Sequence, residues 1–299
     1  MTALRSGFSD LLAPGLSEVV AASYKQYPDE YTKIFNVETS ERKYETTTTI
    51  EGLPIAPVKT EGTSVTYNDL TQGYDKNHTH ITYGEGFRVS REMYDDDLYG
   101  IMKRAAAYLG RAIKQRTEVG AANVFNNGWQ TGAAYLGPDG IELFSRVHPW
   151  ARGGTAVNEP ASPVDLSLAS LEAGITAIET LTEASGSPVQ LIVKTLLVPA
   201  NLRWEASVLL ESQYEPGNAN NDKNPITNLD LSWTINHYLT DTDAWFLLAE
   251  GNELKFYMRQ KPVFENDDDF DTKDAKFTCT TRFATGWADW PGTYGSPGV

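Results

Sequence analysis

Residues 90–128, SREMYDDDLYGIMKRAAAYLGRAIKQRTEVGAANVFNNG, form the stretch that decides the fold. Ser90 is a favourable helix N-cap, and the acidic residues after it suit the positive end of a helix dipole. The Asn-Asn-Gly at 126–128 is a typical helix stop. Between them, apolar residues recur at helical spacing, namely Leu98, Ile101, Met102, Ala105, Leu109, Ala112 and Ile113. The pattern predicts one helix of about 37 residues, roughly 55 Å long at 1.5 Å per residue.

Three glycines, Gly100, Gly110 and Gly120, lie within this predicted helix. Each weakens an α-helix by on the order of 1 kcal/mol relative to alanine. The sequence therefore predicts a helix that can bend rather than a rigid rod. Basic residues follow the first half of its apolar face, namely Arg111, Lys114 and Arg116.

The sequence upstream of the helix predicts an arm and then a hairpin. Apart from a short helical candidate at 16–24, the first 40 residues are polar and tyrosine-rich, which indicates an extended arm. A threonine-rich strand begins at Tyr44, and a stretch with Pro54 and Pro57 stiffens the turn before the chain returns. A two-stranded hairpin with few apolar positions is marginal alone in water. We therefore expect this hairpin to rest on another surface.

The sequence downstream of the helix indicates a connector and then an α/β unit. Residues 128–163 are rich in Gly and Pro, with short strands expected near Ala134 and Leu143. An amphipathic helix at 168–181, a buried strand at 189–198 and a second helix at 201–211 follow. This alternation is typical of helices packed on a sheet.

The C-terminal third is predicted to be rich in strands. Three strands are expected near 229–236, 245–249 and 254–263. The acidic run at 265–274 is predicted to be a solvated loop, and a last strand follows at 275–287. The strand contains the single cysteine, Cys279, which we expect to be a small buried side chain.

The composition limits the classes of function. The chain has 299 residues, of which 40% are hydrophobic and 22% are charged, as in a folded globular protein. Its net charge of −15 argues against a broad nucleic-acid-binding surface, because such surfaces cluster Lys and Arg. An acidic chain can still surround a nucleic acid without gripping it. A signal-peptide core is not apparent, and the longest apolar stretch, at 191–200, is short and carries Lys194, so we expect cytoplasmic assembly and no membrane partner.

Histidines and acidic residues provide candidate metal sites. His78 and His80 alternate along a predicted strand and could bind a metal together with Asp75 or Asp69. Two histidines are few for such a site, so we interpret them as surface or partly packed residues and keep a metal-dependent enzyme as a remote alternative. His148 and His237 lie far apart in sequence, have no ligand pattern, and are interpreted as structural.

Other motifs fail at defining positions. Asp267, Asp269 and Asp271 are spaced like a calcium loop, but Thr272 and Thr278 replace its glycine and bidentate glutamate. Weak cation binding by this loop remains open. Residues 84–86, Gly-Glu-Gly, lack the rest of a dinucleotide fingerprint, and we expect these glycines to turn the chain into the long helix. We predict a protein with no catalytic, cofactor-binding or metal-binding residues, and therefore not an enzyme.

Three segments carry a resemblance to a known family: LPIAPVKTEGTSVTYNDLTQGY at 53–74, THITYGEGFRVSREMYDDDLY at 79–99 and TRFATGWADWPGTYGS at 281–296. Together with the order of elements, they resemble the Hong Kong 97-like major capsid proteins of tailed bacteriophages, with a distant similarity to the Mu-like major head subunit. The resemblance implies an α+β fold with an N-terminal arm, an extended hairpin called the E-loop, a long spine helix and a central α/β axial domain.

The resemblance also implies a domain plan. The plan places the N-terminal arm at 1–43, the E-loop hairpin with its lead-in strand at 44–86, the peripheral spine-helix domain at 87–155 and 246–299, and the axial domain at 156–245. Contacts between subunits are expected at Pro54, Pro57, Lys59, Glu61, Arg104 and Arg111. Some relatives join neighbouring subunits through a Lys–Asn crosslink, but no partner motif for Lys59 is identified, so crosslinking is not expected.

The implied function is self-assembly into pentamers and hexamers of an icosahedral virion head. Such a shell would enclose double-stranded DNA without sequence-specific binding and would be assembled in the host bacterial cytoplasm. About 40 residues precede the hairpin, which is short for a built-in scaffold, so we expect a separate scaffolding protein as well as a portal protein. A decoration protein remains open. The alternative within the same fold is an encapsulin-like cage that holds a cargo enzyme.

Overall fold

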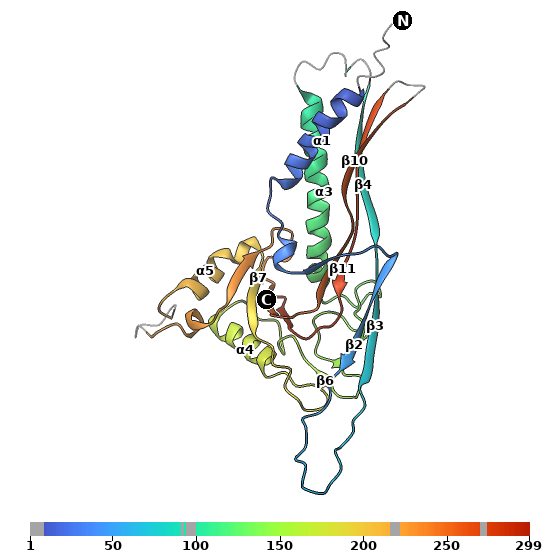
Figure 1. Cartoon of the computed structure of the whole chain (residues 1–299). Coiled ribbons are helices and arrows are strands. Elements are labelled where there is room, and N and C mark those ends of the chain that lie inside the picture. Colours follow the sequence, from blue (N-terminus) through green and yellow to red (C-terminus); the bar gives the residue numbers. More distant parts are fainter. Residues whose placement is uncertain (1–8, 91–92, 94–99, 216–221, 270–273) are drawn as a thin grey trace, which may run out of the picture.

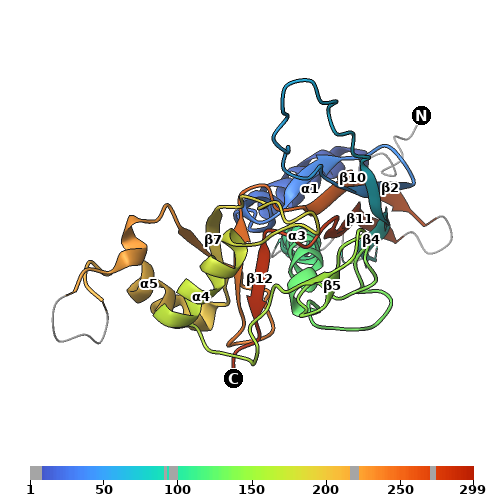
Figure 2. The same ribbon diagram turned by 90° about the horizontal axis from the view of Figure 1, so that it is seen from below.

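The computed structural model describes residues 9–90, 93, 100–215, 222–269 and 274–299 of the chain. A long body contains the longest helix and the longest strands, and a smaller unit lies on one side of it (Figure 1). A hairpin projects from the end of the body opposite the one that carries the first helix, α1 (Ser9–Lys25). Seen from below, the smaller unit stands clear of the body on one flank (Figure 2).

The long helix, α3 (Ile101–Asn126), has 26 residues, about 39 Å of helix. The prediction of one continuous helix from Ser90 is wrong at Gly100, which adopts φ 65° and ψ 33° at the N-cap. This left-handed backbone cannot continue a right-handed helix, and glycine adopts it without steric cost. The N–H of Met93 does donate to Ser90 Oγ at 3.4 Å, as at a helix start. The other predicted first-turn residues, 91–92 and 94–99, lie outside the described residues.

Gly110 and Gly120 permit close packing on two sides of α3. A Cβ at Gly110 would lie 2.5 Å from the carbonyl oxygen of Val20, and one at Gly120 would lie 2.6 Å from the ring of Phe283. Both distances are far shorter than van der Waals contact. The glycines therefore admit helix α1 (Ser9–Lys25) on one side and the sheet on the other. Bending at these positions stays a prediction.

The N-terminal segment packs on the body, which differs from the extended arm predicted from its polar sequence. Helix α1 lies against α3, and their contact buries an apolar cluster that includes Leu16, Val20, Ala106 and Leu109. A single 3-10 turn, η2 (Tyr31–Lys33), follows. The apolar residues of the tyrosine-rich run supply this packing, because Tyr31, Ile34 and Phe35 are all buried.

The main sheet has the order β1-β10-β11-β4 and lies beside α3 (Figure 1). Strands β10 (Leu254–Asp268) and β11 (Ala275–Trp287) form a long antiparallel hairpin. Strand β4 (Ile81–Val89) pairs with β11 in antiparallel fashion, and β1 (Asn36–Thr39) pairs with β10 in parallel. Alternate side chains of β11 are buried, including Cys279, as predicted. Burial raises the pKa of the Cys279 thiol to about 11.

Two sequence expectations are corrected in this sheet. Residues 265–268 continue β10 and pair with β11, so the acidic run is strand at its start, because alternate side chains of an edge hairpin can remain in water. Gly84 and Gly86 lie inside β4 rather than in a turn. A Cβ at Gly86 would come 2.8 Å from the carbonyl oxygen of Phe277, so close strand packing accounts for this glycine.

The smaller unit is built on a second sheet, with the order β12-β9-β7-β8. Its strands are β7 (Val193–Val198), β8 (Ser232–Ile235), β9 (Trp245–Ala249) and β12 (Thr293–Ser296). The first three were predicted, whereas β12 falls in a Gly- and Pro-rich tail that gave no strand signal. Burial of all four β12 residues between the two units explains why this short segment is ordered as a strand.

Helices α4 (Leu168–Glu179) and α5 (Arg203–Glu211) accompany this sheet, as predicted. Ser167 and Ser170 form a reciprocal capping box that starts α4. Two 3-10 turns, η3 (Ala200–Leu202) and η4 (Pro225–Asn228), flank α5 and its loop. An apolar core between the helices and the sheet includes Leu171, Leu196 and Leu247.

The connector after α3 is mostly irregular. Its strands are β5 (His148–Pro149) and β6 (Thr155–Ala156), not the segments near Ala134 and Leu143. Leu143 reads as a strand residue in sequence because it is apolar, but it packs in the central core. This core joins the two sheets through aromatic rings in contact, including those of Phe125, Phe144, Phe246, Phe256 and Phe283.

Candidate assembly interface

The hairpin consists of β2 (Tyr44–Glu51) and β3 (Thr71–Thr79), joined by residues 52–70, here called the hairpin loop. The loop carries large apolar side chains that are almost fully exposed: Val58 is 94% exposed and Tyr67 is 91% exposed. Further exposed members are Leu53, Ile55, Val65 and Leu70. Apolar groups concentrated on one exposed segment indicate a contact surface for another molecule.

Four of the predicted contact residues, Pro54, Pro57, Lys59 and Glu61, lie in this loop. A turn at the tip places Gly62 at φ +81°, and the N–H of Thr63 donates to the carbonyl of Thr60 at 3.2 Å. Pro54 is half-buried and the other three are exposed. The tip therefore presents both charged side chains, Lys59 and Glu61, to the surroundings.

The other two predicted contact residues lie far from the loop, on α3 (Figure 1). Arg104 is exposed on the outer face of the helix. The Arg111 guanidinium lies 5.7 Å from the ring centre of Tyr27 and 5.9 Å from that of Tyr108. The structure therefore does not bring Arg104 and Arg111 together with the hairpin loop within one subunit.

Glu51 and Arg152 fix the root of the hairpin loop, which is the place where β2 ends and β3 begins. The buried Glu51 carboxylate accepts hydrogen bonds from the backbone N–H groups of Ala151 and Arg152. The Arg152 side chain then bridges to the other side of the loop. Its Nε donates to Thr71 Oγ1 at 2.9 Å, and its terminal nitrogen donates to the carbonyl of Asp69 at 2.6 Å. These contacts hold both ends of the loop against the connector.

Sequence reasoning did not identify the contact between Glu51 and Arg152. Arg152 lies about 80 residues beyond the segment that it holds, so no local pattern connects the two. The threonine-rich sequence did predict the first hairpin strand, and in the structure its threonines form hydrogen bonds to the opposite strand. Thr46 donates to Asn77 at 2.6 Å, and Thr48 donates to Asp75 at 2.6 Å.

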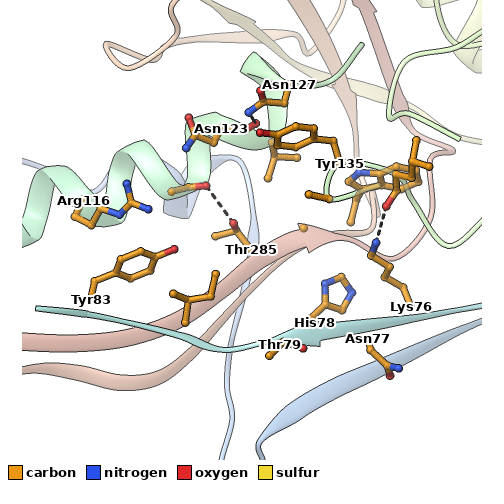
Figure 3. A pocket seen from close by; sticks show the side chains of 17 residues that line it. Lys76, Asn77, His78, Thr79, Tyr83, Arg116, Asn123, Asn127, Tyr135 and Thr285 are labelled. Atoms are coloured by element: carbon orange, nitrogen blue, oxygen red, sulfur yellow. Dashed lines mark hydrogen bonds between the residues drawn. The ribbon is translucent and has the colours of Figure 1, made fainter. Parts of the chain in front are cut away.

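A groove of about 380 Å³ lies beside the hairpin, between α3, strands β3 and β4, and the connector near residue 135 (Figure 3). Arg116 and Asn123 of α3 line one wall, and Lys76 and His78 of β3 line the opposite wall. Figure 3 shows Arg116 near one end and Lys76 near the other. None of the described residues that line the groove is acidic.

The polar groups in this groove differ in how well they are paired. The Arg116 guanidinium lies over the ring of Tyr83, 4.2 Å from its centre, and its buried Nε has no partner among the described residues. Lys76 Nζ donates to the carbonyl of Leu136 at 2.5 Å. Burial lowers the pKa of Lys76, and burial with the nearby Lys76 charge lowers the pKa of His78 to about 4. His78 is therefore neutral near pH 7.

A buried ionic cluster anchors the N-terminal segment to α3. Lys114 and Glu118, each 1% exposed, pair at 2.8 Å, and Lys114 also bonds the Asp29 carboxylate. The Glu118 oxygens accept hydrogen bonds from the N–H groups of Glu30 and Tyr31, each at 3.1 Å. Burial raises the pKa of Glu118, and Lys114 and the two N–H groups oppose the rise. This cluster fixes the path of the chain as it leaves α1.

The anchor extends to the smaller unit. The Glu30 carboxylate accepts from the backbone N–H of His237 at 3.0 Å and contacts its Nδ1 at 2.6 Å. His237 is therefore structural, as predicted. The segment at 29–31 connects α3 to the loop after β8, so the two units are joined by polar contacts as well as by their common core.

The family model described as "Phage capsid protein" matches residues 73–296, which is most of the chain. The chain belongs to the phage capsid protein family. The match includes α3, the second sheet, strands β4, β10 and β11 of the main sheet, the connector with Arg152 and most of β3. The groove therefore lies within the matched region of this capsid protein. No curated protein sequence matches the chain.

Solved structures confirm the fold of the capsid protein. The capsid of bacteriophage JBD30 decorated with minor capsid protein trimers has 17% identity and a TM-score of 0.56, and the match covers 72% of this chain and 92% of that one. Microbacterium phage Oxtober96 has 12% identity and a TM-score of 0.56, with coverage of 90% and 91%. A virus-like particle from Pyrococcus furiosus has 10% identity and a TM-score of 0.54, with coverage of 94% and 97%. The predicted α+β, Hong Kong 97-like fold is confirmed.

The candidate metal residues of the capsid protein are held in separate contacts. His78 is buried and contacts Thr47 Oγ1 at 3.2 Å, whereas His80 is buried against Ser40 Oγ at 2.9 Å. Both are more deeply packed than predicted. The described part of the chain contains no group of three or more His, Cys, Asp or Glu residues that could hold a metal ion.

The remaining candidate motifs have structural environments. His148 is fully buried, stacks on Trp290 with 4.6 Å between ring centres, and pairs with Asp139 at 2.6 Å. Asp269 pairs with Lys276 at 2.6 Å, while Asp271 lies outside the described residues. Among the described helices of the capsid protein, none has the length and apolar character needed to cross a membrane.

Proposed function

We propose that this capsid shell protein self-assembles into pentamers and hexamers that form an icosahedral phage head around double-stranded DNA. The hairpin loop carries this proposal, because it exposes large apolar side chains at the end of a root that is held in place. A preordered, exposed apolar segment loses less conformational freedom on binding than a free one. A neighbouring subunit is the partner that a shell supplies at every position.

Simple association rules support a shell. Contacts that join two different surfaces of one chain produce a ring when the rotation closes. Each loop then contributes one modest contact, and many such contacts in one particle strengthen one another through multivalency. Pro54, Pro57, Lys59 and Glu61 are assigned to this interface, and Arg104 and Arg111 to a second one on the outer face of α3.

The charge of the chain agrees with a container for DNA. At a net charge of −15, the subunit would be repelled by phosphate rather than bind it, so we assign no sequence-specific DNA contact. We further propose a mechanical role without catalysis. A separate scaffolding protein and a portal protein are the assigned partners, a decoration protein remains open, and assembly would occur in the host bacterial cytoplasm before the subunit enters the virion.

The proposed domains follow the sequence plan: an arm at 1–43, a hairpin with its lead-in strand at 44–86, a peripheral domain at 87–155 with 246–299, and an axial domain at 156–245. We assign α4, α5, β7 and β8 of the smaller unit to the axial domain and the long body to the peripheral one. Strands β9 and β12 complete the second sheet, although almost all of their residues fall in the 246–299 segment of the plan. Placing the axial domain at the ring axis would leave the hairpin loop free to reach sideways.

A cargo-holding cage of the same fold is the second candidate function, favoured by the likeness to the virus-like particle from Pyrococcus furiosus. The two candidates differ in what the particle contains. Electron microscopy of the purified chain, with and without a co-expressed scaffolding protein, would reveal particles or capsomers in both cases. Nuclease-protected DNA inside particles from infected cells identifies the head, and an enclosed enzyme identifies the cage. A chain that stays monomeric under all these conditions contradicts both.

Deletion of residues 54–63 tests the loop itself. We expect folded subunits, because the loop makes few contacts with its own body, but no stable shells. Circular dichroism checks the fold, and electron microscopy checks the particles. A second variant replaces the same residues with a Gly/Ser segment of equal length, which keeps the reach and removes the apolar groups. Intact shells from both variants would show that the loop is dispensable.

A further inference from the structure

Three charged side chains meet where the N-terminal segment is anchored to α3. Lys114 Nζ contacts Asp29 Oδ1 on one side and lies 2.8 Å from Glu118 Oε1 on the other. The side chains of Lys114 and Glu118 are only 2% and 1% exposed. The ring centres of Tyr24 and Tyr31 lie 5.6 Å and 5.5 Å from the nitrogen. An amine and a carboxyl group are therefore held in contact, beside a second carboxyl group and aromatic rings.

The resting state of this anchor is ionic. Burial is the largest influence on Lys114 and would lower its pKa, but the hydrogen bonds that it donates to Asp29 and Glu118 outweigh burial, and the pKa is raised. Removing charges from water is costly, and a buried ion pair often fails to offset the cost. Condensation of the amine with a carboxyl group would replace two charges by one neutral amide. The buried site therefore favours the covalent product more than water does.

We propose that Lys114 and Asp29 condense to an isopeptide bond between Nζ and Cγ, with Glu118 as the acid–base group that carries the protons. Helix α3 and the segment after α1 hold the reacting groups in contact, which gives an effective concentration that two free groups never reach in solution. Asp29 is the reacting carboxyl group, because its side chain is 46% exposed and the released water can leave. The Glu118 carboxylate is instead held by the N–H groups of Glu30 and Tyr31.

The condensation balances in atoms and charge. The Glu118 carboxylate takes one proton from the Lys114 ammonium, and burial, which raises the pKa of Glu118, helps it to hold that proton. The free amine adds to Cγ of Asp29, and the C–N bond forms. Two protons from the nitrogen pass by way of Glu118 to one Asp29 oxygen, the bond from that oxygen to Cγ breaks, and water leaves. Glu118 ends as a carboxylate, and no oxidant, reductant or further reactant is used.

The bond would close residues 29–114 into a covalent ring that contains the whole hairpin. It forms once in each chain and involves no turnover of a substrate, so it is compatible with a structural protein. It differs from a Lys–Asn crosslink between subunits, because both partners lie in one chain and Lys59 takes no part. It does not require a shell, so its failure would leave the proposed function standing.

Peptide mapping of the folded natural chain tests the bond. Trypsin cuts after a free lysine but not after one whose amine is acylated. We expect residues 112–116 to appear joined to residues 26–33, with a mass lower than that of the separate peptides by one water molecule. Lys194 and Asp230, an exposed ion pair at 2.6 Å, are the internal control and should stay unlinked. Complete cleavage after Lys114, in fresh and aged chain alike, would overturn the proposal, and so would equal linkage at Lys194.

The substitution Glu118→Gln tests the proton carrier. Glutamine keeps an oxygen that can accept from the N–H groups of Glu30 and Tyr31, but it cannot carry the proton. We expect the linked fraction of freshly purified chain to fall at least about tenfold. Glu205→Gln, at an exposed position of α5, is the matched control and should link like the natural chain. Full linkage in Glu118→Gln would overturn the role assigned to Glu118. Circular dichroism verifies the fold of both variants, and the map of the natural chain decides without any substitution whether the bond forms.

Discussion

Arg111, Lys114 and Arg116 show what sequence can and cannot say about single residues. In sequence they are three basic residues on one helix. In the structure Arg111 lies between two tyrosines, Lys114 is buried between carboxylates, and Arg116 lies over Tyr83 in the groove. Their spacing rotates them to different sides of α3. Tyr27 and Asp29, from the segment after α1, and Tyr83 of β4 complete these environments. Because these three partners come from distant sequence, the environments were not predictable from the helix alone.

Asp289 provides a prediction for the pH dependence of stability. Burial, together with the nearby carboxylates of Asp139 and Glu253, raises its pKa from the ordinary 3.8 to about 7. Between about pH 4 and 7 the folded state therefore binds more protons than the unfolded state. The free energy of unfolding contributed by this group falls as the pH rises through that range.

The substitution Asp289→Asn should remove this pH-dependent loss. The amide keeps the oxygen that accepts from the N–H of Trp290 at 2.9 Å. We expect the variant to exceed the natural chain in stability by about 1–3 kcal/mol at pH 8, with no advantage near pH 4. Urea unfolding of the unassembled chain at pH 4, 6 and 8 measures this difference, and the exposed Asp69→Asn serves as a control. A difference that does not change with pH would contradict the assignment.

At the scale of elements, periodic segments were predictable and irregular ones were not. The helices α4 and α5 and the strands β7, β9 and β11 carry repeating apolar patterns that sequence reveals directly. The start of α3 was misplaced because a glycine can either occupy a helix or end it, and the choice at Gly100 depends on its backbone conformation. The β12 strand was missed because its order comes from burial between two units.

The glycines within α3 have two competing explanations: they could allow the helix to bend, or they could allow neighbouring segments to pack closely against it. If they serve only to bend the helix, Gly110→Ala should stabilise the chain by about 0.5–1 kcal/mol through higher helix propensity. The close approach of Val20 predicts the opposite, a loss of about 1–3 kcal/mol from overpacking. Gly120→Ala should behave in the same way because of Phe283. Chemical unfolding, with the exposed Gln115→Ala as the control, decides between the two signs.

At the scale of the whole molecule, the sequence predicted the projecting loop but not what surrounds it. Proline and glycine identify a turn between the two hairpin strands, and four predicted contact residues belong to it. The returning strand was expected from about residue 64, whereas β3 begins at Thr71, so the loop is longer than predicted. The groove and the Arg152 clamp were missed because each joins segments that are distant in sequence. A loop can be predicted from its local composition. A groove cannot, because it forms only when strands and helices that are distant in sequence pack together.

The Arg152 clamp leads to a prediction about particles rather than subunits. Arg152→Ala removes the bonds to Asp69 and Thr71 and the 3.7 Å ion pair with Glu51. The backbone N–H groups of residues 151 and 152 still donate to the Glu51 carboxylate, so the subunit should fold. The loop would then lose its fixed exit direction, and each docking event would have to order it again at a conformational cost. Because that cost recurs at every interface, a small loss per subunit should lower the particle dissociation temperature markedly. Light scattering during heating measures it, with the exposed Arg42→Ala as the control, and equal dissociation temperatures for the two variants would show that the loop needs no clamp.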